Sequence, residues 1–190
     1  MIQTKDDLQE FLKRDRLALY KHSKPKLFGD YVYKFEIALR MCEYYKNTNK
    51  KSLLSLYYKY KYKKLSKELG FTIPLNVFDK GLSIAHYGTI VIHPGAVIGE
   101  NCRIHEGVTI GATNGFAKAA KIGRNAFIAS GAKIIGDITI ADDVAIGANA
   151  VVVKDIMECG TTWAGVPAKK ISDHDSHLNI NPELFEDIKK

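Results

Sequence analysis

The sequence predicts a mainly β protein, in which short strands stack as a parallel solenoid behind a small α-helical N-terminal segment. An aliphatic residue returns every six residues from Ile92 to Ile110 and again from Ile122 to Val152. This period fits neither a lone helix nor an ordinary strand, so it indicates an architectural repeat. Each unit is too short to bury its own apolar side chain, so the units must stack and bury an aliphatic column together. Helical spacing, by contrast, is found mainly in the first 70 residues.

Residues 4–69 are expected to form helices. Thr4 with Asp7 resembles a capping pair for the first helix, and a break at 22–29 that contains a proline precedes the second. The third helix is expected to stop at Gly70, because glycine readily adopts the left-handed backbone that ends a helix.

The positive charge of the chain is concentrated in this helical segment. The whole chain has a formal charge of +7, whereas residues 1–70 hold 17 Lys and Arg against 8 Asp and Glu. Nine of the ten tyrosines lie there too, interleaved with lysines. This pattern is compatible with a nucleic acid or an anionic membrane. We favour helical packing faces with a solvated lysine side, and therefore expect no nucleic-acid partner; membrane-surface association stays open but is not expected.

The N-terminus is charged and has no apolar signal region, and no stretch approaches a transmembrane length. We therefore expect a soluble, cytoplasmic protein. Its three cysteines are widely spaced and match no metal-binding pattern, so they are expected to be reduced thiols, and no metal is expected.

The repeat has two irregularities. Upstream of Ile92 the sixfold pattern continues, but it is shifted by two residues at Ile90, and His86 lies beside this slip. Between Ile110 and Ile122 the spacing doubles, and only Phe116 occupies the column position, which predicts a loop that covers a ligand.

The chain is thus expected to comprise an α-helical segment at 1–70, a repeat domain at 71–171 and a C-terminal tail at 172–190. The tail is polar and is expected to end in a short helix over 181–190.

Three motifs occur in order within the repeat: GLSIAHYGTIVIHPGAVIGENCRIHEGVTIGATNG, IGANAVV and AGVPAKKI. Over roughly residues 70–171 they resemble the serine acetyltransferase branch of the hexapeptide-repeat acyltransferases. The resemblance implies a left-handed parallel β-helix with three hexads per coil, an exception to the right-handed crossover rule. It also implies a homotrimer or a dimer of trimers that binds acetyl-CoA in the cleft between neighbouring subunits.

His86 aligns with the general base of that family. An imidazole that titrates near neutral pH can remove the proton of an alcohol as the alcohol attacks a thioester. With the two-residue slip, residue 106 stacks one coil away from residue 86, so we expect Glu106 to orient His86. A solvated glutamate or a substrate contact is the alternative for Glu106. His93 and His105 are expected to be exposed histidines that point outward from the coils.

The resemblance also implies an acetyl-CoA-binding surface of small residues along the repeat, with two lysines near the nucleotide phosphates. For each glycine a tight-corner role is the alternative. The candidates are Gly111, Ala112, Ser130, Gly131, Ala132, Gly147, Ala148, Gly165, Lys169 and Lys170.

The chain departs from the family pattern where serine itself would be held. The family has an Asp fifteen residues before the catalytic His, where this chain has Phe71-Thr72-Ile73-Pro74, and another Asp immediately before the His, where this chain has Ala85. The Arg-His pair of the family's loop becomes Lys118 and Ala119.

Three functions follow as hypotheses. The favoured one is acetyl-CoA-dependent O-acetylation of a hydroxyl acceptor, for which we favour a sugar of a surface polysaccharide. The second is L-serine O-acetylation for cysteine synthesis. The third is a β-helix that is not an acyltransferase, either a scaffold or a metal-dependent lyase similar to the γ-class carbonic anhydrases, although the separations of His86, His93 and His105 do not match that metal site.

Overall fold

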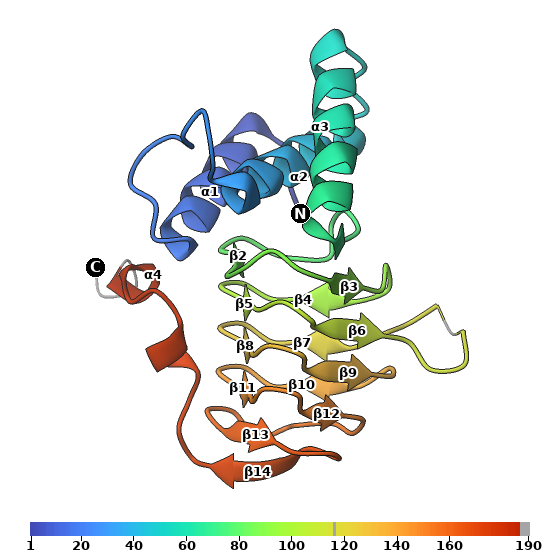
Figure 1. Cartoon of the computed structure of the whole chain (residues 1–190), viewed down its shortest axis with the longest axis vertical. Helices are drawn as coiled ribbons and strands as arrows, with labels where there is room; N and C mark the ends of the chain where they lie inside the picture. The colour runs from blue at the N-terminus through green and yellow to red at the C-terminus, as the bar shows by residue number, and fades with distance from the viewer. Residues whose placement is uncertain (116, 187–190) are drawn as a thin grey trace.

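The computed structural model describes residues 1–115 and 117–186, and in it a helical segment stands on one end of a column of stacked coils (Figure 1). The expectations for Phe116 and for the last four residues of the predicted tail helix lie outside the described residues. The helices of the segment are α1 (Lys5–Ala18), α2 (Tyr31–Asn47) and α3 (Leu53–Leu69). None of the described helices is long and apolar enough to span a bilayer.

The helix ends form as the local sequence predicts. The Thr4 hydroxyl accepts a hydrogen bond from the Asp7 backbone N–H at 3.0 Å, and the Asp7 carboxylate accepts one from the Thr4 N–H at 2.8 Å. This reciprocal capping box satisfies backbone donors that have no partner within the helix. Helix α3 ends at Gly70, which has a φ of 79°.

The column is built from short strands that lie on three sides. Its elements are β1 (Phe71–Thr72), β2 (Ser83–Ile84), β3 (Ile90–Ile92), β4 (Val97–Ile98), β5 (Arg103–Ile104), β6 (Thr109–Gly111), β7 (Lys121–Ile122), β8 (Phe127–Ile128), β9 (Lys133–Ile135), β10 (Thr139–Ile140), β11 (Ala145–Ile146), β12 (Val151–Val152), β13 (Thr162–Ala164) and β14 (Lys169–Ser172). The three sheets have the orders β1-β3-β6-β9-β12, β10-β7-β4 and β14-β13-β11-β8-β5-β2. All pairs are parallel except β13 with β14, so the chain winds as a parallel β-helix.

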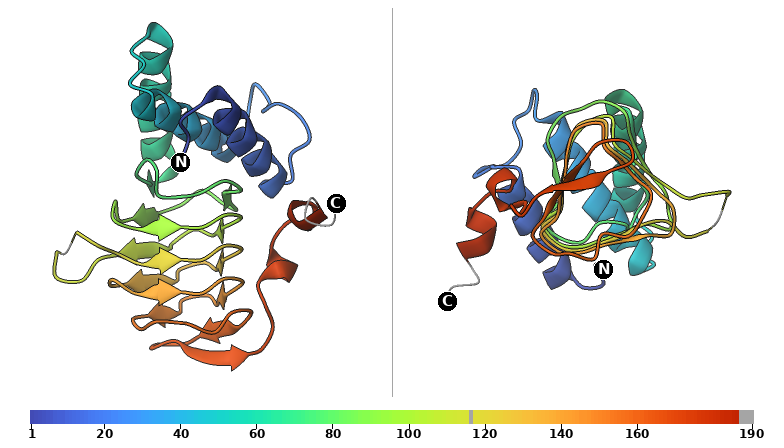
Figure 2. Two further views of the ribbon diagram at one scale, coloured as in Figure 1. Left: turned by 180° about the vertical axis from the view of Figure 1, so that it is seen from behind. Right: turned by 90° about the horizontal axis from the view of Figure 1, so that it is seen from below.

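The register of the strands explains both irregularities of the repeat. Ile92 pairs with Ile110, which sets a regular coil of three hexads, and Ile110 pairs with Ile134. The second offset is one hexad longer because the connection between β6 and β7 leaves the column as a projecting loop (Figure 2). Ile84 pairs with Ile104, two residues more than a regular coil, as the slip predicts.

The interior of the column is the predicted aliphatic stack. None of its members is more than 4% exposed, from Ile92 to Val152. Because side chains of this column fill the inside, functional side chains must lie on the corners and outer faces of the coils.

Buried charged side chains of the helices cover the open edge of the first coil. Arg40 is fully buried and donates to the carbonyl oxygens of Phe78 and Asp79 at 2.9 and 2.7 Å. Asp15 accepts from the backbone N–H groups of Gly81 and Leu82. An edge strand otherwise presents unpaired backbone groups, so the helical segment acts as a polar cap on the column.

The C-terminal tail returns along the outside of the coils toward α1 (Figures 1 and 2). It contains a 3-10 turn, His177–Asn179, and the short helix α4 (Glu183–Glu186). Leu184 and Ile180 pack with Ala18 of α1. His177 lies 2.7 Å from Asp143, which fastens the tail to a corner of the column.

Candidate active site

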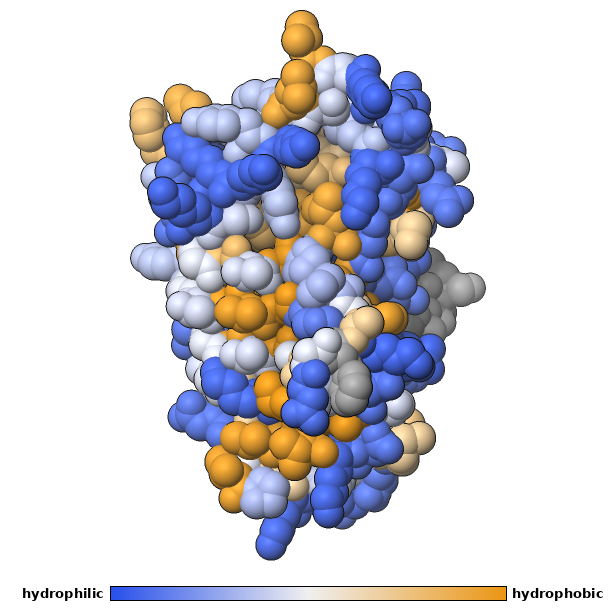
Figure 3. Space-filling view, turned by 90° about the vertical axis from the view of Figure 1, so that its right-hand side faces the viewer, coloured by the Kyte–Doolittle hydropathy of each residue, from blue (hydrophilic) through white to orange (hydrophobic). Residues whose placement is uncertain are grey.

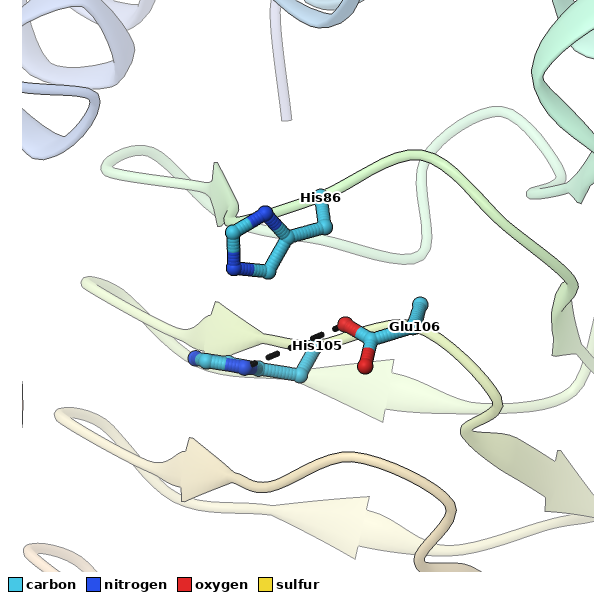
Figure 4. A group of neighbouring side chains, drawn as sticks. All are labelled: His86, His105 and Glu106. Atoms are coloured by element: carbon cyan, nitrogen blue, oxygen red, sulfur yellow. Dashed lines mark ion pairs between the residues drawn. The ribbon is translucent and has the colours of Figure 1, made fainter.

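Three polar side chains meet at one corner of the first two coils. His86 follows β2, whereas His105 and Glu106 follow β5, which is the next strand of the same sheet. Because Ile84 pairs with Ile104, residue 106 lies one coil from residue 86, as the sequence predicts. One nitrogen or oxygen of each side chain lies within 4.8 Å of the others, and Figure 4 shows the three facing one another.

The negative charge at this corner is on the Glu106 carboxylate. Hydrogen bonding from Ser130 and from the Glu106 backbone lowers the pKa of its carboxyl, and the neighbouring histidines add to this effect. Its Oε2 atom is shielded from solvent and lies 4.0 Å from Nδ1 of His105. An ionised carboxylate therefore lies beside His86, whose side chain is exposed.

The expectation that His105 is an exposed histidine is wrong. His105 points outward, but its side chain is only 21% exposed, because His86 and Phe127 cover the two sides of its ring. The ring centroids lie 5.6 and 5.3 Å from that of His105, both in edge-to-face geometry. Burial, aided by Arg103, lowers the pKa of His105, so it stays neutral at neutral pH. The strand register expected from the sequence places residue 105 one coil from residue 86, as observed. No pattern in the sequence indicated that the His105 ring would be packed between neighbouring rings.

His93 is also half-buried rather than exposed. Its Nδ1 accepts a hydrogen bond from the backbone N–H of Gly95 at 3.0 Å. His93 follows β3, whereas His86 precedes this strand, so the two lie at opposite ends of β3 and His93 does not take part in the histidine cluster.

Most of the predicted cofactor-binding residues lie on the same corner as His86, in successive coils. Ser130, Gly131 and Ala132 come next below Glu106, since the Gly131 N–H donates to the Glu106 carbonyl at 2.9 Å. The Ser130 hydroxyl lies 3.5 Å from Nδ1 of His105.

Gly147 and Ala148 form the next corner, and Gly165 follows one coil further. Small side chains at this corner leave the backbone open to an extended ligand. A single column of small residues thus leads away from His86.

Gly111 and Ala112 lie elsewhere. They end β6, whereas Ser130–Ala132 precede β9, and these strands pair with Gly111 beside Ile135. The two groups therefore occupy opposite ends of one sheet, and a single chain does not bring them together.

Some of the predicted cofactor-binding residues also have a structural role within the fold. Gly131 has a φ of 75°, and a Cβ placed there would meet Oδ1 of Asn149 at 2.1 Å, so its corner favours glycine whatever binds outside. Lys170 pairs with Glu158 and lies 2.6 Å from Asp173, so it already has anionic partners, whereas Lys169 is exposed.

Two of the positions that depart from the serine acetyltransferase pattern are buried and apolar, whereas Lys118 is exposed. Phe71 is 3% exposed and its ring packs edge-to-face on Phe35, with the centroids 5.0 Å apart. Ala119 is 1% exposed and carries no polar group. Neither position can supply a polar contact to a substrate.

The cluster of His86, His105 and Glu106 also has the side-chain types of a metal site. One donor atom of each side chain lies within 4.8 Å of the others, and Nδ1 of His105 lies 4.0 Å from Oε2 of Glu106. The roughly 3.4 Å between ligands of a tetrahedral zinc ion with bonds of about 2.1 Å is shorter, so binding such an ion would require these two side chains to move closer.

Comparisons with known proteins agree with this fold. The family model described as bacterial transferase hexapeptide (six repeats) matches residues 119–154. No curated protein matches the chain.

Among solved structures, serine acetyltransferase from Brucella abortus strain S19 is 26% identical with a TM-score of 0.71, over 90% of this chain and 71% of that one. Serine acetyltransferase from Neisseria gonorrhoeae is 26% identical with a TM-score of 0.65, over 88% and 66%. A serine acetyltransferase in complex with CoA is 28% identical with a TM-score of 0.64, over 87% and 68%.

These matches confirm the left-handed parallel β-helix behind short helices. The chain spans 66 to 71% of the length of these three structures. The repeat and the fold of this chain therefore resemble those of the hexapeptide-repeat acyltransferases, and the solved structures to which it is similar are serine acetyltransferases.

Proposed function

We propose that the chain is an acetyl-CoA-dependent O-acetyltransferase that uses His86 as general base and acts on a hydroxyl of a sugar. The observation that carries this proposal is the corner at which the exposed His86 meets the ionised Glu106, above a column of small residues. A base and a carboxylate that orients it are the groups that alcohol acylation needs.

In this mechanism His86 accepts the proton of the acceptor hydroxyl while the oxygen attacks the thioester carbonyl of acetyl-CoA. The C–S bond then breaks, the acetyl group stays on the acceptor oxygen as an ester, and the proton passes from His86 to the departing CoA sulfur. Glu106 stabilises the imidazolium that forms between these two transfers. Both substrates must be bound together, because no acyl-enzyme forms.

The cofactor would lie along the corner column of Ser130, Gly131, Ala132, Gly147 and Ala148. Small side chains there let the pantetheine arm lie against the backbone. Serine acetyltransferases similar to this chain have been solved with coenzyme A, which supports this assignment.

A homotrimer would complete the site. Gly111 and Ala112 lie at the far end of the sheet from His86, so they can contact the same cofactor only from a neighbouring subunit. The face shown in Figure 3 carries a band of apolar side chains along the coils, and exposed valines of the coils include Val91, Val97 and Val153. An apolar band on coil faces supports association, and a native mass of one or two trimers distinguishes the two assemblies.

The buried, apolar Phe71 and Ala119 favour a sugar over L-serine, because both replace polar groups of the family pattern. L-serine acetylation remains the second candidate, since the structural neighbours are serine acetyltransferases and one is solved with serine. A cytoplasmic location fits the three free cysteines.

The test is acetyl-CoA-dependent release of CoA, measured by thiol titration against a blank without acceptor. Saturating L-serine, nucleotide sugars and glycans are the acceptors. Stimulation by a sugar and not by serine supports the proposal, and stimulation by serine alone favours the second candidate. Protein that binds no acetyl-CoA would exclude both.

A further inference from the structure

A pocket joins His86 to the connection between α1 and α2. Its volume is about 510 Å³, and its lining includes Lys21, Asp30, Tyr31 and Tyr33 on one side and His86 and Tyr87 on the other. Figures 1 and 2 show this connection on the same side of the molecule as β2. The volume lies in the range of small-molecule pockets. Because the pocket reaches the imidazole, a molecule bound in it is next to the base.

Two aromatic side chains of the pocket face solvent. Tyr87, next to His86, is 69% exposed, and Tyr31, the first residue of α2, is 51% exposed. Packing in the hydrophobic core accounts for neither of these two tyrosines, because most of each side chain lies outside the core. The Lys34 ammonium lies over the Tyr31 ring, 5.4 Å from its centroid. An aromatic face that stays open offers a flat apolar surface with negative electrostatic potential, on which weakly positive C–H groups of a ligand can lie.

The charged groups of the pocket neutralise each other. Asp30 accepts from Lys21 at 2.7 Å through one oxygen and from the backbone N–H of Lys26 at 2.9 Å through the other. Each carboxylate oxygen therefore already accepts one hydrogen bond, and the Lys21 ammonium already has an anionic partner. Among the described residues of the lining, no other lysine, arginine, aspartate or glutamate is present.

The Lys21–Asp30 ion pair favours a neutral ligand over a charged one. A zwitterionic amino acid would have to displace Lys21 from Asp30 to gain ionic contacts. A neutral ligand with many hydroxyl groups can instead use the polar rim without breaking the pair, while its C–H face covers a tyrosine ring.

We infer that this pocket is the acceptor subsite, and that it takes a neutral pyranoside whose ring lies against Tyr31 or Tyr87 and directs a hydroxyl at His86. The inference rests on the proposed acetyl transfer. It assigns acceptor specificity to the helical segment, which supplies Tyr31 and the Lys21–Asp30 pair, rather than to the repeat alone.

The test compares four variants with the unaltered protein. Tyr31→Ala and Tyr87→Ala remove the rings, whereas Tyr31→Phe and Tyr87→Phe keep them and remove only the hydroxyls. Tyr57→Ala is the matched control, because Tyr57 is 52% exposed on α3 and lies outside this pocket. The probes are methyl glycosides of gluco, galacto and manno configuration, and L-serine, with CoA release as the readout and acetyl-CoA binding measured by calorimetry.

We expect a methyl glycoside to accelerate CoA release. At least one alanine variant should raise the KM for that glycoside about tenfold, which corresponds to about 1.4 kcal/mol, and leave the KM for acetyl-CoA unchanged. The matching Phe variant and Tyr57→Ala should behave like the unaltered protein.

Three results overturn the inference, and each has a distinct meaning. If acetyl-CoA binds but no methyl glycoside accelerates CoA release, the pyranoside assignment is wrong. If a glycoside is acetylated and both alanine variants keep its KM, the acceptor binds elsewhere. If acetyl-CoA does not bind at all, the proposed function itself fails.

Discussion

The substitution Arg40→Met tests whether the helical segment holds the first coil in place. Arg40 is fully buried and reaches Asp15 through two hydrogen bonds of 2.7 and 3.3 Å and Glu43 through one of 2.9 Å. Burial opposes its charge, but the two carboxylates outweigh this effect and raise the pKa of Arg40. Methionine fills a similar volume but donates no hydrogen bond.

The expected loss of stability follows from what the substitution leaves behind. Asp15 and Glu43 would remain buried without their cation, and removing one partner of a buried pair costs roughly 3–5 kcal/mol. The carbonyl oxygens of Phe78 and Asp79 would also lose their donor. Typical domains are stable by only about 5–15 kcal/mol, so this one change should remove a large share of the total.

Urea denaturation followed by circular dichroism, at one protein concentration, measures the effect. With an m value of about 2 kcal/mol/M, the midpoint should fall by about 2 M. Arg124→Met is the control: Arg124 pairs with Asp142 at 3.0 Å but is 64% exposed, so we expect less than about 1 kcal/mol. Equal, small losses in both variants would refute the idea that Arg40 caps the column.

Four further outcomes follow from the site and its surroundings. His86→Ala should lower turnover by roughly two to four orders of magnitude, and Glu106→Gln should lower it with an unchanged KM for acetyl-CoA; retained turnover would contradict the role of each. Burial, then Asp15, raise the pKa of Glu36, so the folded state binds its proton more tightly and loses stability as the pH rises above about 4.5. Glu36→Gln should therefore gain stability relative to the unaltered protein as the pH rises above about 4.5 in urea titrations. A stability difference that does not change with pH would contradict a raised pKa for Glu36. Dialysis against EDTA should leave activity unchanged, and loss that zinc restores would reveal a metal at His86, His105 and Glu106.

Much of the column could be predicted from the chain because its order is local. Each hexad contacts its neighbours in the stack, so a spacing counted along the sequence translates directly into register. The two-residue slip before Ile92 was therefore enough to place Glu106 one coil from His86, as the pairing of Ile84 with Ile104 shows. The helix caps at Thr4 and Gly70 were equally local signals.

What the repeat could not reveal are the contacts between segments far apart in the chain. The burial of His105 depends on the side-chain packing of three successive coils, and periodicity carries no information about rotamers. In the sequence, Arg40 is one of many cations in the basic helical segment. In the structure it donates hydrogen bonds to backbone carbonyls of the first coil. The pocket beside His86 exists only because the 19–33 region docks against β2. Docking of this kind is a sum of many non-local packing contacts, and no short stretch of sequence encodes it.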